Sequence, residues 1–172
     1  MEIEEIFQDK SIKLKSKVAI LGAGLLDGGL SLQLLLEYAD QQNAVDKATC
    51  LEAIEYATKN NPGIGNSALL KYLTNVLGGS EPRIKWESAK IIGNIIRLFP
   101  DQLDNTVASL LKNTRNSGTV VRWATAYALA EIIKLKTVQN DFLIPEVELL
   151  CELEEDNGVK KKYLDVLKKI KK

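Results

Sequence analysis

A repeat of 37 residues constrains the fold of this chain more than any other feature of its sequence. Segment 84–98 can be aligned with segment 121–135, and nearly every aligned pair agrees in character. The alignment places Trp86 on Trp123, which gives the period of 37 residues. A fixed period of roughly 20 to 50 residues is typical of proteins built from stacked supersecondary units. We therefore expect a repeat architecture.

The repeated segments have the spacing of an α-helix. Small or apolar residues recur at positions i, i+3, i+4 and i+7, which form one face of a helix. The segments between the copies, 64–77 and 101–113, carry apolar residues at helical spacing as well. Pro62 and Pro100 follow the first helices and would end them, and Asp101 could cap the next one. The aligned sets are Cys50, Ala53, Ile54 and Ala57, then Ser88, Ile91, Ile92 and Ile95, then Thr125, Ala128, Leu129 and Ile132.

Each unit is therefore expected to be a pair of helices joined by a short turn, and the chain to be all-α, since we find no convincing β-strand. We predict one repeat domain over 1–172. Its complete repeats span 44–80, 81–117 and 118–157. A degenerate N-terminal cap repeat spans 1–43, and a C-terminal capping helix spans 158–172. Terminal repeats deviate because one of their faces meets water.

Segment 121–129, Val-Arg-Trp-Ala-Thr-Ala-Tyr-Ala-Leu, resembles the first helix of the HEAT repeat, whose usual pattern is Val-Arg-x-x-Ala-x-x-Ala-Leu. Segment 85–95 is a looser match. The resemblance to the HEAT-repeat (armadillo-like α-solenoid) family covers about residues 45–137 well. It implies a right-handed α-α superhelix, a short α-solenoid of about four to five antiparallel helix pairs. HEAT repeats usually have an Asp in the turn before Val-Arg, whereas these turns are Gly79-Ser80-Glu81 and Asn116-Ser117-Gly118.

Composition excludes several classes of site. The chain has 23 basic and 23 acidic residues, so the overall basic excess of most nucleic-acid binders is missing. It has no histidine, which excludes His-based zinc sites and Ser-His-Asp triads. Cys50 and Cys151 are interpreted as buried thiols in a reducing compartment. The acidic N-terminus is not a signal peptide, and the apolar run 18–26 is too short to cross a membrane. We expect a cytoplasmic protein without cofactor or metal.

Segment 17–28, Lys-Val-Ala-Ile-Leu-Gly-Ala-Gly-Leu-Leu-Asp-Gly, is similar to the strand and glycine loop of a dinucleotide-binding fold. The third glycine of that fingerprint should be at position 27, where the chain has Asp27. No second strand follows at the expected distance. A glycine-containing helix, or a turn between two helices, is the favoured interpretation, and a nucleotide site is the alternative.

Three further features each have a structural and a functional interpretation. Trp86 and Trp123 could pack at the start of the first helices or anchor a partner. Lys85 and Arg122 could join neighbouring repeats or contact phosphate. The C-terminal lysines could be a solvated face or a surface for an acidic partner, a nucleic acid or a membrane. In each case we favour the structural interpretation. These lysines are Lys160, Lys161, Lys162, Lys168, Lys169, Lys171 and Lys172.

We find no carboxylate pair that stands out as catalytic, so a non-catalytic scaffold that binds a protein or peptide is the favoured function. In helical-repeat stacks the second helices usually line the concave, ligand-binding side. The alternative is a nucleic-acid-binding protein related to the HEAT-like DNA alkylation-repair proteins. The mixed charge of the candidate surface favours a protein partner. The candidate partner-binding residues are Gln33, Glu37, Lys71, Asn75, Ser109, Lys112 and Arg115.

Overall fold

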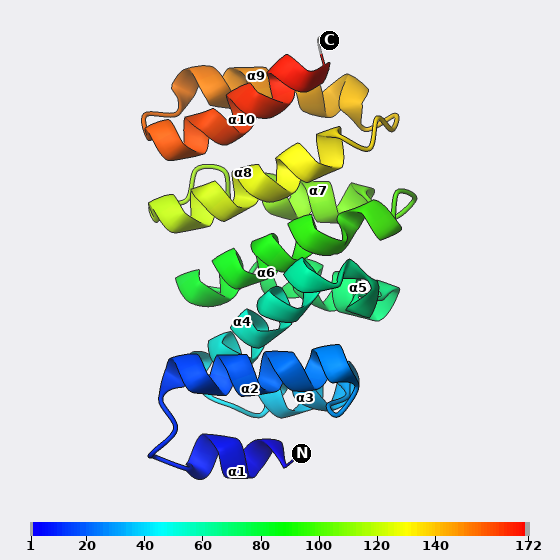
Figure 1. Ribbon diagram of the computed structural model, residues 1–172. Helices are drawn as coiled ribbons and strands as arrows, with labels where there is room; N and C mark the ends of the chain where they lie inside the picture. The colour runs from blue at the N-terminus through cyan, green and yellow to red at the C-terminus, as the bar shows by residue number, and fades with distance from the viewer. Residues whose placement is uncertain (1, 171–172) are drawn as a thin grey trace. The chain divides into compact units, whose positions relative to one another are not determined.

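The computed structural model describes residues 2–170, and within them the chain folds into ten α-helices and two short 3-10 helices without a β-strand (Figure 1). The expected all-α class is confirmed. The chain forms two compact units, Met1–Asn66 and Ser67–Lys172. The boundary falls inside the predicted repeat 44–80, and the division of the chain into repeats stays a prediction.

The first unit consists of four α-helices and one 3-10 helix. Local sequence explains where they begin, because the Ser31 hydroxyl accepts from the backbone N–H of Leu34 and the Asn43 amide oxygen accepts from Val45 and Asp46. Helix α4 packs along both α2 and α3. The elements are α1 (Ile3–Gln8), α2 (Leu14–Asp27), α3 (Leu32–Asp40), α4 (Ala44–Asn60) and η1 (Pro62–Ile64).

The glycine-rich segment lies in helix α2, so the strand that a dinucleotide fold requires is absent and the helical interpretation is confirmed. Gly22 is buried where α2 crosses α4. A Cβ atom there would lie 2.5 Å from Cδ1 of Tyr56, so only glycine permits this approach. Gly28 has a φ of 79° and ends α2 in the left-handed conformation that favours glycine. Both glycines therefore serve helix packing and termination.

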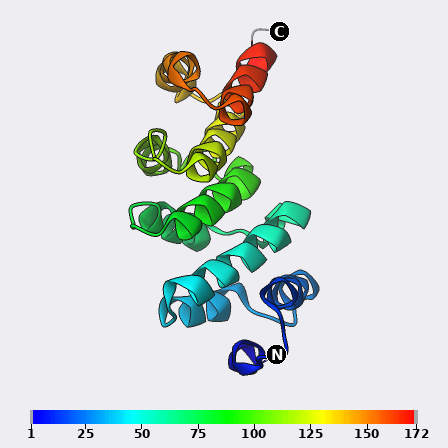
Figure 2. The same cartoon turned by 90° about the vertical axis from the view of Figure 1, so that its left-hand side faces the viewer.

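The second unit has two layers of helices, which lie side by side in the view of Figure 2. One layer contains α6, α8 and α10, with α6 packed on α8 and α8 packed on α10. The other contains α5, α7 and α9, with α5 next to α7. The bounds are α5 (Ser67–Val76), α6 (Pro82–Ile95), η2 (Ile96–Leu98), α7 (Asp104–Leu111), α8 (Thr119–Ile133), α9 (Asn140–Leu153) and α10 (Asn157–Ile170).

The first layer supplies most of the core of this unit. Ile92 of α6 and Ile132 of α8 have no exposed surface, as the helical spacing predicts. Gly93 allows α6 and α8 to approach closely, because a Cβ atom at this position would lie 2.4 Å from Cε1 of Tyr127. Gly93 and Tyr127 are 34 residues apart, as are Gly22 and Tyr56, so the same glycine–tyrosine contact occurs in both units.

Two helix starts differ from the sequence predictions. The helix expected over 64–77 begins only at Ser67, because Pro62 starts a separate 3-10 turn. Asp101 does not cap α7. The N-cap position is Leu103, which has no capping side chain, and Asp104 is the first helical residue. In the polypeptide from residue 2 to residue 170, no helix is long and apolar enough to cross a bilayer.

Candidate functional site

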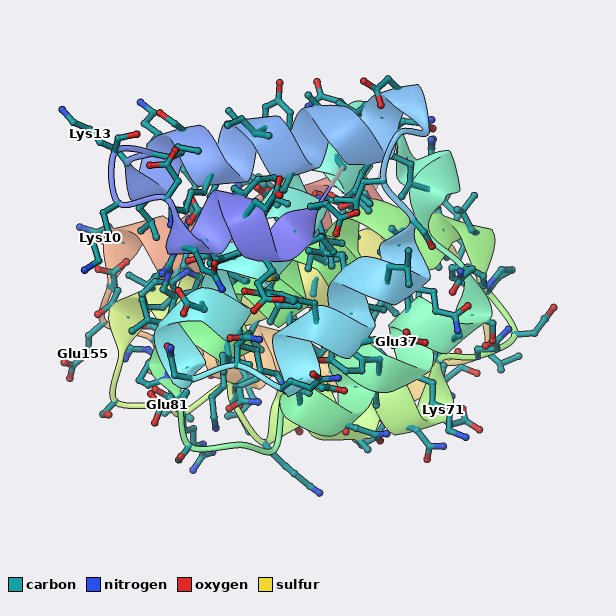
Figure 3. All side chains as sticks on the ribbon, turned by 90° about the horizontal axis from the view of Figure 1, so that it is seen from below. Lys10, Lys13, Glu37, Lys71, Glu81 and Glu155 are labelled. Atoms are coloured by element: carbon teal, nitrogen blue, oxygen red, sulfur yellow. The ribbon has the colours of Figure 1, made fainter. Side chains whose placement is uncertain are left out.

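A groove of about 580 Å³ lies between α5 and α7 in the second unit. Four of the seven predicted partner-binding residues line it: Lys71 and Asn75 from α5, and Ser109 and Lys112 from α7 and its C-terminal end. Lys71, Asn75 and Lys112 are exposed, and Ser109 is half-buried. Figure 3 shows Lys71 extending away from the ribbon. We refer to this hollow as the α5–α7 groove.

Hydrogen bonds join α5 to the α7 segment across the groove. At its floor the hydroxyls of Thr74 and Thr106 are 3.0 Å apart and both residues are buried. At one end the Ser67 hydroxyl donates to Oε1 of Gln102 over 2.6 Å. Because paired polar groups that are buried help to fix helix positions, the Thr74–Thr106 contact supports a preformed groove.

The groove carries charges of both signs. Lys71 and Lys112 supply two ammonium groups, and Asp101 and Asp104 supply two carboxylates. The remaining polar lining residues are Ser67, Asn75, Gln102, Asn105 and Ser109, whose amides and hydroxyls can both donate and accept hydrogen bonds. Such a surface suits a ligand that has backbone amides and side chains of both charges.

The other three predicted residues lie outside the α5–α7 groove. Arg115 follows the end of α7 and lines a separate hollow of about 430 Å³. Gln33 and Glu37 are exposed on α3 of the first unit, where Gln33 Nε2 donates to Glu37 Oε1 over 2.8 Å. Arg115 was predicted to lie on a helix, but α7 has already ended at Leu111.

Sequence reasoning missed an exposed apolar face on α9. Phe142, Leu149 and Leu153 have 57%, 45% and 58% of their surface exposed. Leu153 lines the same hollow as Arg115. Exposed apolar residues that share a helix face mark a candidate contact surface. Their spacing along the sequence, i, i+7 and i+11, places them on one helix face but does not show whether that face is covered.

Lys85 and Arg122, which align in the repeat, contact the protein itself. Arg122 donates from Nε and Nη2 to the two carboxylate oxygens of Glu154 at 3.0 and 3.1 Å. Lys85 Nζ donates to Oδ1 of Asn113 over 2.8 Å. In each case a basic side chain near the start of one first-layer helix (α6 or α8) donates to a residue in the segment that precedes the next first-layer helix (α8 or α10). The structural interpretation is therefore confirmed for both residues.

Trp123 and part of the lysine-rich C-terminus also serve packing. The Trp123 ring lies against Tyr127 with centroids 6.1 Å apart, and Lys162 Nζ lies 4.6 Å from the Trp123 ring centre. Trp86, by contrast, donates from Nε1 to Oε1 of the buried Glu87 over 2.7 Å. Both tryptophans are half-buried. Lys171 and Lys172 lie outside the described residues.

Across residues 2–170, no three side chains of Cys, Asp or Glu come together in a way that could hold a metal ion. Comparison with known proteins adds no candidate either: no family model, curated protein or solved structure matches the chain. The resemblance to HEAT repeats therefore stays a prediction that rests on the residues quoted above.

Proposed function

We propose that this chain is a non-catalytic binding module that holds a protein or peptide segment in the α5–α7 groove. The observation that carries the proposal is the convergence of Lys71, Asn75, Ser109 and Lys112, from two helices, on one preformed groove. Polar side chains of both charges can pair with the backbone and side chains of a polypeptide.

Contacts that recur along the second unit support a short right-handed α-solenoid of the HEAT-repeat kind. Ser67 bonds to Gln102, and Asp104 bonds to Gln139. Asp104 follows Ser67 by 37 residues, and Gln139 follows Gln102 by 37 residues. This spacing equals the period of the sequence repeat. A stack of this kind gives its second-layer helices one continuous ligand-facing side.

The exposed apolar residues of α9 extend the proposed surface. Leu153 and Arg115 share the hollow beyond α7, so a polypeptide held in the α5–α7 groove could also place an apolar side chain there. Interfaces between proteins combine apolar and polar contacts, and arginine is enriched in them. The α5–α7 groove and this hollow together offer both kinds.

Nucleic-acid binding is the second candidate, and the charges of the groove favour it less. Affinity for nucleic acid comes mainly from basic side chains that neutralise phosphates. Asp101 and Asp104 line this groove together with Lys71 and Lys112, so a phosphate backbone would meet repulsion as well as attraction.

We also propose a reducing, cytoplasmic location, which fits the two buried free thiols.

An affinity capture from cell lysate tests the proposal, with the purified chain as bait and with nuclease treatment in one arm. We expect discrete proteins that survive nuclease and are lost with the Lys71→Glu/Lys112→Glu variant. A fluorescein-labelled DNA duplex is titrated in parallel at two salt concentrations. Salt-sensitive binding of the duplex, together with nuclease-sensitive capture, would replace the protein partner with a nucleic acid.

A further inference from the structure

A second groove, of about 550 Å³, lies between α9 and α10 and is separate from the α5–α7 groove. Its floor is apolar, with Cys151 from α9 and Leu167 from α10, both nearly buried. Leu164 of α10 also lines it and is 38% exposed. We refer to this hollow as the terminal groove.

Among the described residues no further helix covers the terminal groove. Elsewhere in the second unit, each first-layer helix has a successor packed on it, since α8 packs on α6 and α10 packs on α8. Helix α10 packs on α8 and α9, and Leu164 stays partly exposed beside them.

The rims of the terminal groove are charged with opposite signs. Glu148 and Glu152 stand on the α9 side, and Lys160 and Lys168 stand on the α10 side. Only residues 154–156 separate the two helices, so Glu152, near the end of α9, and Lys160, near the start of α10, lie at the same end of the groove. Glu152, Lys160 and Lys168 form no ion pair with other described residues.

We propose that the terminal groove is the contact surface for a second copy of this chain, related to the first by a twofold axis that runs along the groove. Such an axis places α9 of one copy over α10 of the other. Glu152 of each copy then faces Lys160 of the other, and the two apolar floors meet. A twofold axis across the groove would instead place the acidic side of α9 over α9 of the other copy and the basic side of α10 over α10. Because like charges would then meet, the charges favour the axis along the groove.

Sedimentation velocity over a wide range of concentrations tests the interface. Wild-type protein should self-associate to a dimer, and Glu152→Lys and Lys160→Glu should each raise the dissociation constant about tenfold or more, because each creates two like-charged contacts. An equimolar mixture of these two variants should form a heterodimer, because both charged contacts between unlike copies then join a lysine to a glutamate. A monomeric wild type, or a mixture that stays monomeric, would overturn the proposal.

Two controls separate this interface from general charge effects. Leu164→Asn should weaken association without altering charge, because it removes an apolar contact. Lys10→Glu, in the first unit, and Glu81→Lys, at the residue before α6, change exposed charges that do not line the terminal groove, and they should leave association unchanged (Figure 3). Circular dichroism establishes that every variant is folded. Equal weakening by Glu152→Lys and Glu81→Lys would refute the assignment to the terminal groove, as would a dimer that tolerates Leu164→Asn.

Discussion

Arg122 donates two hydrogen bonds to the carboxylate of Glu154, and its Nη1 also donates to the backbone oxygen of Asn116 over 2.9 Å. One guanidinium thus ties the start of α8 to the turn before it and to the turn between α9 and α10. The side chains of Arg122 and Glu154 are only 19% and 7% exposed.

Replacing Glu154 by Gln should lower the free energy of unfolding at neutral pH by about 1–3 kcal/mol, because Arg122 would lose a charged partner while remaining partly buried. Urea unfolding measures the loss. Glu155→Gln is the matched control, since Glu155 is exposed and adjacent, and its unfolding should change by less than about 0.5 kcal/mol. Equal effects of the two substitutions would show that the pair contributes nothing.

The same pair should make stability depend on pH. Burial alone would raise the pKa of Glu154, but hydrogen bonds from Arg122 and Asp156 and the charge of Arg122 outweigh it and hold the pKa below 4.5, its ordinary value. A lowered folded-state pKa stabilises the fold fully above pH 4.5, and this contribution disappears as the pH falls through the folded-state pKa. The difference in unfolding free energy between wild type and Glu154→Gln should therefore shrink in acid. A difference that stays constant down to about pH 2 would contradict this linkage.

Gly93→Ala should destabilise the second unit, although alanine favours helices more than glycine does. The new methyl group would meet the Tyr127 ring, which cannot move away easily because its hydroxyl donates to Asn94 over 2.9 Å and its face contacts Trp123. We expect a loss of about 1–3 kcal/mol in urea unfolding. At Gly78 a Cβ atom would come no closer than 3.6 Å to its nearest neighbour, a backbone oxygen, so Gly78→Ala serves as the control. A more stable Gly93→Ala variant would show that the helices do not approach this closely.

Ile92→Ala and Ile132→Ala should each cost about 2–5 kcal/mol, because both side chains are fully buried between helices and their removal leaves a cavity. Val120→Ala is the control, since Val120 is 52% exposed at the start of α8. A loss below about 1 kcal/mol for either isoleucine would mean that the position is not part of the core.

Cys50 should resist thiol reagents in the folded protein. Burial, with a smaller contribution from the carboxylate of Asp46, raises the pKa of the Cys50 thiol to about 12, so almost no thiolate forms at about pH 8. In a Cys151→Ala background, labelling with Ellman's reagent should proceed only after denaturant is added. Rapid labelling without denaturant would indicate that α4 opens readily in the native protein.

The sequence predicted the features that follow from periodicity. Helical spacing identified buried Ile92 and Ile132, and the position of the second helices brought Lys71 and Lys112 to one groove. It did not predict features that depend on how neighbouring elements pack. The α7 start shifted from Asp101 to Asp104, because the cap depends on the turn after η2. The exposure of Leu149 on α9 depends on which helices cover it, and amphipathic spacing carries no information about that.

The most direct test of the α5–α7 groove uses peptides selected from a random display library on the purified chain. Fluorescence anisotropy then gives the dissociation constant of a selected peptide for wild type, for Lys71→Glu/Lys112→Glu, and for the control Lys10→Glu/Lys13→Glu, which reverses two exposed charges in the first unit (Figure 3). If the groove is the binding site, the first double variant loses affinity about tenfold or more and the control retains it. Equal affinity for all three proteins, each with an unchanged thermal unfolding midpoint, would contradict the assignment of the groove.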